Sequence, residues 1–306
     1  MTAPAPTARI GLLLHPRHDV SAVVDQVVGW AQDHGVQVLV RTEDAARCPA
    51  GVVAVPAAAV AHGVQALVSL GGDGTMLGAL RLAAAAPVPV LGVNLGRVGF
   101  LVEVEPSELP AALDQIERQD FDIEEHAALV LTLANDEHVT FNDVALARVP
   151  GDGPVGVVMS VDGRGMGRCR CDALIVATPL GSTAYSYAAG GPVVSPRLAA
   201  MTVSPVAPMS GISRPVVLSA EESLELSVAE DSGRPAVEVD GRVLRLAEPG
   251  ESMLVRLRLR AGLVIRLDAS RYQRRTQVKL SLLDLPFLPD EMHDLAIPDT
   301  TGRHAR

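Results

Sequence analysis

The stretch Ala66-Leu-Val-Ser-Leu-Gly-Gly-Asp-Gly-Thr75 decides the fold that this sequence predicts. Its first five residues form an apolar run of strand length, and the next five form a glycine-rich turn. The segment from Met76 to Ala86 then has the pattern of a helix, which ends before Pro87. Glycines allow positive φ angles and let a polyphosphate approach the main chain, and the start of a helix offers unpaired amides to an anion. A strand, a glycine-rich turn and a helix in this order indicate an α/β domain with an anion-binding loop.

Strands and helices alternate along the rest of this first part of the chain. Apolar residues recur at helical spacing from Val20 to Ala31, with Asp19 or Ser21 as the expected N-cap and Gly35 as the expected end. Three more apolar runs predict strands, at 10–14, 36–40 and 88–93. This alternation predicts a parallel, doubly wound sheet.

The pattern changes from about Phe121, because long helical periods are missing beyond it. Asp162-Gly163 and Asp240-Gly241 are strong hairpin signals between apolar runs. Eight such runs predict strands, at 129–133, 139–149, 155–161, 169–177, 224–228, 236–239, 253–259 and 263–267. We therefore expect an α/β domain over 1–120 and an antiparallel, β-rich domain over 121–275. For 276–306 we expect a tail that packs back on the first domain and is disordered at its end.

Composition excludes several classes of function. The formal net charge of −10 argues against a binder of nucleic acid or of a membrane surface, since both are held mainly by positive charge. Lys279 is the only lysine, so no lysine upstream of it can take part in a mechanism. Three cysteines do not make a disulfide framework, and neither a secretory signal nor a long apolar run is present. These features predict a soluble, cytoplasmic protein.

Asp73 is the unusual residue of the glycine-rich turn. A carboxylate beside phosphates is repelled unless it binds a metal, accepts a proton from a hydroxyl or fixes a ribose, and each of these tasks belongs to phosphoryl transfer. The alternative is a tight strand-to-helix turn in which Asp73 caps the helix.

Two shorter segments are ambiguous on their own. The loop over 92–101 offers Asn94 and Arg97 as ligand contacts and Phe100 as a stacking ring, but its glycine spacing is not that of a dinucleotide fingerprint. The pair Asn142-Asp143 can bind a purine edge or ribose hydroxyls, or it can simply form a β-turn.

The segment Thr178-Pro-Leu-Gly-Ser-Thr-Ala-Tyr-Ser-Tyr-Ala-Ala-Gly-Gly-Pro-Val-Val194 has the densest concentration of chemistry. Asp172 precedes the strand that leads into it. Its small residues let a ligand approach the backbone, its hydroxyls can bind ribose or amide groups, and Tyr185 can pack against a ring. We interpret this segment as part of a binding site.

These four segments, in this order, resemble the NAD kinase family over roughly residues 9 to 275. The family shows a G-G-D-G-T loop, an N-x-G-x-x-G-F segment, an Asn-Glu pair and a T-P-T-G-S-T-A-Y block, and the last of these is the most specific. The resemblance implies a Rossmann-like α/β N-terminal domain and an all-β, β-sandwich-like C-terminal domain, with NAD between them. It also implies a phosphotransferase with an alcohol acceptor, which moves a phosphoryl group from ATP or polyphosphate, with Mg²⁺, to the 2′-hydroxyl of the adenosine ribose of NAD. Homodimers or homotetramers are expected, and the sequence does not decide between these two assemblies. It also does not decide whether the donor is ATP or polyphosphate, or whether the acceptor is NAD or NADH.

The same resemblance implies a role for each site residue. Asp73 corresponds to the general base, and no protein side chain is expected to bind the metal directly. The positions expected to contact NAD are Gly74, Phe100, Asn142, Asp143, Asp172, Thr183, Ala184, Tyr185 and Ala188. The positions expected to hold the phosphate donor are Gly71, Gly72, Thr75 and Arg97.

The chain also departs from the family pattern. Asp143 replaces a glutamate, Leu180 a threonine and Ala188 a serine, Met209 stands where a histidine is common, and the usual aromatic and lysine-rich helix is missing over 280–295. Two alternatives therefore accompany the main interpretation. One is a dinucleotide-binding sensor with weak catalysis. The other is a lipid or small-molecule kinase that shares the G-G-D-G-T loop.

Overall fold

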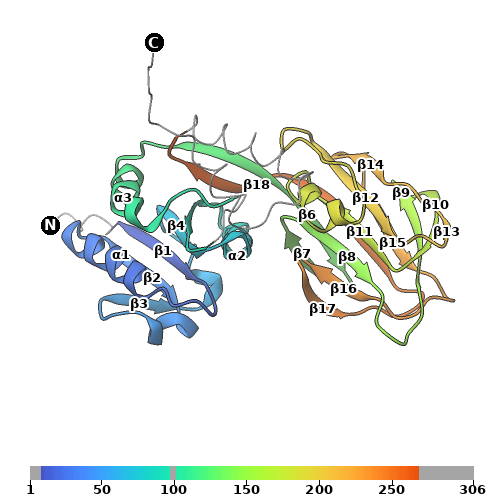
Figure 1. Cartoon of the computed structure of the whole chain (residues 1–306), viewed down its shortest axis with the longest axis horizontal. Helices are drawn as coiled ribbons and strands as arrows, with labels where there is room; N and C mark the ends of the chain where they lie inside the picture. Colours follow the sequence, from blue (N-terminus) through green and yellow to red (C-terminus); the bar gives the residue numbers. More distant parts are fainter. Residues whose placement is uncertain (1–7, 97–100, 269–306) are drawn as a thin grey trace, which may run out of the picture.

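The computed structural model describes residues 8–96 and 101–268, and these form two domains joined by two long strands (Figure 1). The architecture combines mixed sheets with few helices. Within the described residues, no helix is long and apolar enough to cross a membrane.

The first domain is built on five parallel strands in the order β3-β2-β1-β4-β5. Helices α1 and α3 contact each other on one face of this sheet, and α2 covers the other. The strands are β1 (Arg9–Leu14), β2 (Gln37–Arg41), β3 (Val52–Val55), β4 (Ala66–Gly71) and β5 (Pro89–Asn94). The helices are α1 (Ser21–Asp33), α2 (Asp73–Ala83) and α3 (Leu109–Arg118), with short 3-10 turns η1 (Thr42–Arg47), η2 (Ala57–Ala59) and η3 (Pro106–Glu108).

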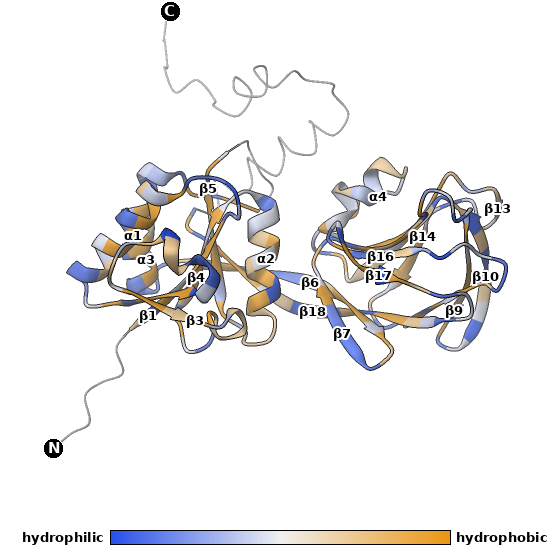
Figure 2. Cartoon of the chain, turned by 90° about the horizontal axis from the view of Figure 1, so that it is seen from below, coloured by the Kyte–Doolittle hydropathy of each residue, from blue (hydrophilic) through white to orange (hydrophobic). Residues whose placement is uncertain are grey.

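Two apolar layers explain why the first sheet is covered on both faces. Alternate residues of a strand point to opposite sides, so Leu12 joins the core under α1 and α3 while Leu13 joins the core under α2. Strands buried on both faces read as continuous apolar runs, as in β4, where all six residues are buried. Figure 2 colours hydrophobic residues orange, and the strands at the centre of the first domain are largely orange there.

The second domain consists of two stacked antiparallel layers. One layer is a separate six-stranded sheet in the order β14-β12-β11-β8-β16-β17, and the other extends the first sheet through β6, β7, β9, β10, β13, β15 and β18. Apolar side chains of both layers fill the space between them. The strands are β6 (Asp122–Leu133), β7 (Asp136–Thr140), β8 (Asp143–Ala147), β9 (Val155–Val161), β10 (Arg164–Cys171), β11 (Ala173–Ala177), β12 (Ala200–Val206), β13 (Ser210–Gly211), β14 (Val216–Ser219), β15 (Leu224–Val228), β16 (Ala236–Val239), β17 (Arg242–Leu246) and β18 (Ser252–Arg266), with η4 (Gly181–Thr183) and α4 (Tyr185–Ala188) between β11 and β12.

The long strands β6 and β18 carry one sheet through both domains (Figure 1). They pair antiparallel over most of their length, and the end of β18 pairs in parallel with β5. A register shift between Arg258 and Gly262 bends the pair, and Arg260 has a positive φ of 54° there. The two domains are therefore tied by main-chain hydrogen bonds.

Several expectations are confirmed and others are wrong. Both Asp-Gly pairs form hairpins with positive φ at each residue, and Gly35 follows the end of α1 with φ 65°. The N-cap of α1 is Val20 rather than Asp19 or Ser21, although the carboxylate of Asp19 accepts the Ser21 N–H at 3.0 Å. The expected strand 139–149 is split into β7 and β8, 169–177 is split into β10 and β11 in different sheets, and the two runs after 252 are the single strand β18.

Candidate functional site

The Gly71–Thr75 loop joins the end of β4 to the start of α2. A side chain at Gly71 would collide with the Thr75 side chain, so the turn is too tight for any other residue there. A Cβ at Gly72 or Gly74 would meet no atom within 4 Å. The loop therefore presents bare main chain on its open side, and Thr75 lies buried beneath it.

Asp73 is the first residue of α2 and is half-buried. The alternative prediction, that Asp73 caps the helix, is wrong. Gly72 occupies the N-cap position of α2, and no side chain forms a capping hydrogen bond there. The Asp73 carboxylate instead accepts a hydrogen bond from the Leu101 N–H at 2.9 Å. It is therefore held at the edge of the loop, at the positive end of a helix dipole.

The second glycine-rich loop runs beside the first. The Leu95 N–H donates to the Gly71 carbonyl at 3.3 Å, and the Asn94 side chain bonds to Gly96 N–H and to Glu105. Asn94 thus fixes the loop internally. Arg97 and Phe100 lie outside the described residues, so their predicted contacts with donor and adenine stay predictions.

Asn142 and Asp143 lie where β8 begins, after a bend in the chain. The Asn142 carbonyl accepts the Thr178 N–H at 2.9 Å, and the Thr178 hydroxyl donates to the Phe141 carbonyl at 2.6 Å. Gly181 packs so closely on the Asn142 main chain that a side chain there would overlap it. The structure therefore brings the Asn-Asp pair and the Thr178 segment together, although 36 positions separate Asn142 from Thr178 in the sequence.

Asp143 is 4% exposed and lies near other carboxylates. Burial first, and then the charges of Asp240 and Glu238, raise the pKa of Asp143 to about 7. Near neutral pH this carboxyl can either donate or accept a hydrogen bond. Such a group suits a ligand that presents both kinds of partner.

The Thr178–Val194 segment folds back over the six-stranded sheet as η4 and α4. Ser182 and Ser186 are buried and bond to neighbouring groups, so these hydroxyls hold the segment together. Thr183 and Ala184 are half-buried, while Tyr185 and Ala188 are exposed. Two of the positions that we expected to contact NAD, Tyr185 and Ala188, therefore lie on the exposed side of the segment.

Tyr185 and Asp172 complete this group. Partial burial, and then the charges of Glu238, Asp143 and Asp172, raise the pKa of the Tyr185 phenol. Asp172 itself forms an ion pair with Arg148 at 3.1 Å.

An ion pair connects this part of the site to helix α2, which begins in the Gly71–Thr75 loop. Arg81, near the end of α2, contacts the buried carboxylate of Asp240 in the β16–β17 turn. Asp240 in turn accepts the Asn142 N–H at 2.7 Å. In Figures 1 and 2, α2 is the helix of the first domain that lies toward the second domain.

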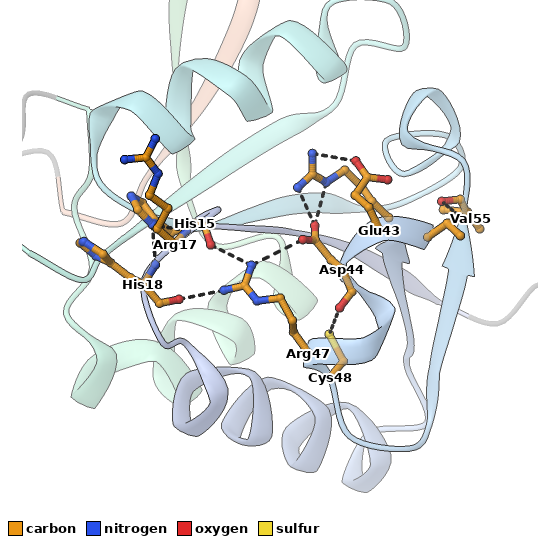
Figure 3. A network of polar contacts seen from close by, with 10 residues as sticks. His15, Arg17, His18, Glu43, Asp44, Arg47, Cys48 and Val55 are labelled. Carbon is orange, nitrogen blue, oxygen red and sulfur yellow. Dashed lines mark hydrogen bonds and ion pairs between the residues drawn. The ribbon is translucent and has the colours of Figure 1, made fainter.

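Sequence reasoning missed a basic loop at the same sheet edge. The His15 N–H donates to the Leu70 carbonyl at 2.8 Å, so the loop after β1 lies beside the Gly71 turn. Figure 3 shows Arg47 holding this loop through the carbonyls of His15 and His18, while it also faces Asp44. Burial, and then His18, Arg47 and Arg17, lower the pKa of His15. A cavity of about 370 Å³ is lined by Pro16, Arg17, His18, Asp19, Val20, Ser21 and Arg47.

No metal cage is built by the described residues, which contain no cluster of three or more His, Cys, Asp or Glu side chains able to hold an ion. Mg²⁺ that binds mainly through substrate phosphates and water does not require such a cluster.

Comparison with known proteins covers both domains. Residues 10–121 match the family model described as ATP-NAD kinase N-terminal domain, and residues 141–265 match ATP-NAD kinase C-terminal domain. NAD kinase 1 of Streptomyces avermitilis is 34% identical over 91% of this chain and 88% of its own length. The NAD kinase of Heliobacterium modesticaldum is 40% identical over 70% of this chain and 77% of its own length.

Solved structures share the fold. Yeast NADH kinase complexed with NADH superposes with a TM-score of 0.79, at 23% identity, over 93% of this chain and 90% of that one. An NAD kinase from Archaeoglobus fulgidus in complex with ATP superposes with a TM-score of 0.69, at 25% identity, over 89% of this chain and 98% of that one.

Proposed function

The chain belongs to the NAD kinase family, and from this premise we propose how its residues carry out the reaction. The protein is an enzyme that transfers a phosphoryl group from ATP to the 2′-hydroxyl of the adenosine ribose of NAD, which gives NADP. The proposal below concerns the roles of individual residues, the metal and the assembly.

Asp73 is the general base. The observation that carries this assignment is its position: a carboxylate at the start of α2, between two glycines whose Cβ positions meet no other atom. A ribose hydroxyl is a poor nucleophile, and a positioned carboxylate can accept its proton as attack proceeds, which typically contributes about 10²–10⁴-fold.

The donor phosphates lie along the main chain of Gly71, Gly72 and Thr75, with Arg97 as a further cation. The N–H groups at the start of α2 and the helix dipole attract the phosphates. Mg²⁺ bound to these phosphates would reduce their repulsion of Asp73. The basic loop after β1 adds the positive charge of Arg17 at the same edge of the sheet.

NAD lies between the domains. Asn142 and Asp143, with Phe100, hold the adenosine, and Gly74 lets the ribose approach the loop. Supporting this assignment are the contact between the Asn-Asp pair and the Thr178 segment and the exposure of Tyr185. The other half of the dinucleotide is assigned to Asp172, Thr183, Ala184, Tyr185 and Ala188.

Several finer expectations belong to the same proposal. These are a Rossmann-like domain over 1–120, a β-sandwich-like domain over 121–275, a cytoplasmic location and a homodimer or homotetramer. The predicted tail over 276–306 lies outside the described residues. Asp143, in place of glutamate, is shorter by one methylene, and we expect it to affect turnover more than fold.

The test is NADP formation by the purified full-length protein and by Asp73→Asn, with NAD or NADH and with ATP or polyphosphate. We expect the variant to lose NADP formation while its calorimetric affinity for NAD stays within about tenfold, and the exposed Asp25→Asn to match wild type. Full activity of Asp73→Asn would remove Asp73 from this role. If the wild-type protein bound NAD without turnover, it would be a dinucleotide sensor. If it phosphorylated diacylglycerol but not NAD, it would be a lipid kinase.

A further inference from the structure

A single buried carboxylate organises the loop that carries Asn142. Asp240 is 1% exposed at its side chain, and its two oxygens accept hydrogen bonds from the Thr140 hydroxyl, the Phe141 N–H at 3.4 Å and the Asn142 N–H at 2.7 Å. Its own N–H donates to the Asp143 carbonyl at 3.0 Å. The side chain and the main-chain N–H of Asp240 thus hold the four consecutive residues 140–143.

This carboxylate also reaches the other domain. Arg81 lies eight positions after Asp73 on α2, its side chain is 20% exposed, and it both donates a hydrogen bond to Asp240 and forms an ion pair with it. Helix α2 also contacts the long strand β18 and the short strand β7. The helix that begins with Asp73 is therefore attached, near its far end, to the turn that shapes the Asn142 loop.

The contact between Arg81 and Asp240 lies among several carboxylates. Glu238 on β16 and Asp240 in the turn after it lie near Asp143 on β8, and their charges, after burial, raise the pKa of Asp143. A buried carboxylate without a cation is strongly unfavourable, whereas a paired one can be held in a defined geometry. Arg81 supplies the cation, and its planar guanidinium fixes direction as well as charge.

We propose that Arg81 is a positioning residue for phosphoryl transfer, which acts through Asp240 to set helix α2, and with it Asp73, against the loop that holds the adenosine. The inference rests on the proposed roles of Asp73 and Asn142. The guanidinium of Arg81 is paired with Asp240, so we assign Arg81 a positioning role and not a catalytic one. Because a misplacement of about 1 Å can cost about 10²-fold in rate, loss of the ion pair should affect kcat more than binding.

The experiment measures kcat and KM for NAD, calorimetric NAD affinity and thermal unfolding for wild type, Arg81→Met, Arg81→Lys, Asp240→Asn and the double variant Arg81→Met/Asp240→Asn. We expect Arg81→Met to lower kcat by about 10- to 100-fold while KM and NAD affinity stay within about threefold, because three hydrogen bonds from the loop to Asp240 remain. Arg81→Lys should recover part of the loss. The double variant should lose no more than the more impaired single variant, because both changes break one contact. Arg118→Met, on the exposed end of α3, is the matched control and should match wild type.

The proposal is overturned if Arg81→Met keeps kcat within about twofold of wild type, or if only its thermal stability falls. Additive losses in the double variant would also overturn it. Should Arg81→Met fail to fold, Arg81→Lys and Asp240→Asn are judged by the same criteria. A wild-type protein without NADP formation would instead refute the proposed function, so the two failures are distinguishable.

Discussion

The main-chain N–H of Leu101 donates a hydrogen bond to Oδ1 of Asp73 at 2.9 Å. These residues are 28 positions apart, and the bond ties the segment after the second glycine-rich loop to the start of α2. Asp73 therefore has a structural contact in addition to its proposed chemical role. A substitution that removes both cannot tell them apart.

Asp73→Asn and Asp73→Ala should consequently differ in stability but not in activity. An asparagine keeps an oxygen that can accept the Leu101 N–H, whereas alanine leaves that donor without it, at a cost of about 1 kcal/mol in the free energy of unfolding. Neither variant can accept a proton at neutral pH, so both should lose NADP formation. Urea unfolding and a coupled NADP assay measure the two effects, and Asp25→Ala on α1 serves as the control for the lost carboxylate. Equal stability of the two variants would mean that the Leu101 contact contributes nothing.

Asp143 should make stability depend on pH. Its pKa is raised to about 7, so between pH of about 4 and about 7 the folded protein holds a proton that the unfolded chain has released. The contribution of this group therefore favours folding at low pH and is lost as the pH rises through about 7. Over that range the loss amounts to about 4 kcal/mol.

Asp143→Asn tests this dependence because it removes the titration while it keeps the shape. The free energy of unfolding of the variant, relative to wild type, should increase as the pH rises from about 5 to about 8. Denaturant unfolding at a series of pH values measures the difference, with Asp25→Asn as an exposed control. A difference that stays constant with pH would show that Asp143 is not protonated in the folded state.

Most of the first domain could be predicted from local pattern, although helix α3 and strand β3 were missed. β4 is a continuous apolar run whose six residues are all buried. The buried apolar residues of α2 recur at helical spacing. Short or atypical strands were missed for physical reasons. β17 exposes four of its five residues, and Pro205 interrupts the apolar pattern of β12. β3 is apolar throughout but has only four residues.

Contacts distant in sequence could not be predicted. The motifs indicated Asp73, Asn142 and Tyr185, because their residue types and neighbours suggest chemistry. Arg81 and Asp240 are separated by 159 positions, and nothing local to either indicates the other. Figure 1 shows that α2 and the β16–β17 turn belong to different domains, which the long strands β6 and β18 join. Likewise, Arg260 to Gly262 interrupt the apolar pattern, so one bulged strand was predicted as two.

Gly181→Ala should disturb the Asn142 loop. The added Cβ would overlap the Asn142 main chain, and backbone cannot move aside as a flexible side chain can. We expect a loss of about 1–3 kcal/mol in the free energy of unfolding and a weaker affinity for NAD. Gly29→Ala, in the middle of α1 where a Cβ meets nothing within 4 Å, is the matched control and should stabilise the protein by about 0.5–1 kcal/mol. Wild-type NAD affinity in Gly181→Ala would show that the contact does not position Asn142.

Arg266 should be among the residues most important for stability, because it is a buried cation between two carboxylates. Its guanidinium is 5% exposed, bonds to Glu124 at 2.6 Å and to Glu103 at 3.2 Å, and donates to the Leu101 carbonyl at 3.1 Å. Arg266→Met would leave the buried Glu103 and the half-buried Glu124 without this cation, at a cost of about 3–5 kcal/mol. The exposed pair Arg260–Glu125 on the same two strands is the control, and Arg260→Met should cost at most about 1 kcal/mol.

A second variant separates charge from packing at this position. If the loss in Arg266→Met arises from the uncompensated charge, then Arg266→Met/Glu124→Gln should recover part of it, because one buried charge is removed. Denaturant unfolding of the single and double variants measures the recovery. Because Leu101 contacts both Arg266 and Asp73, we also expect Arg266→Met to lower kcat at temperatures where it is fully folded. A double variant less stable than Arg266→Met would show instead that shape at this site matters more than charge.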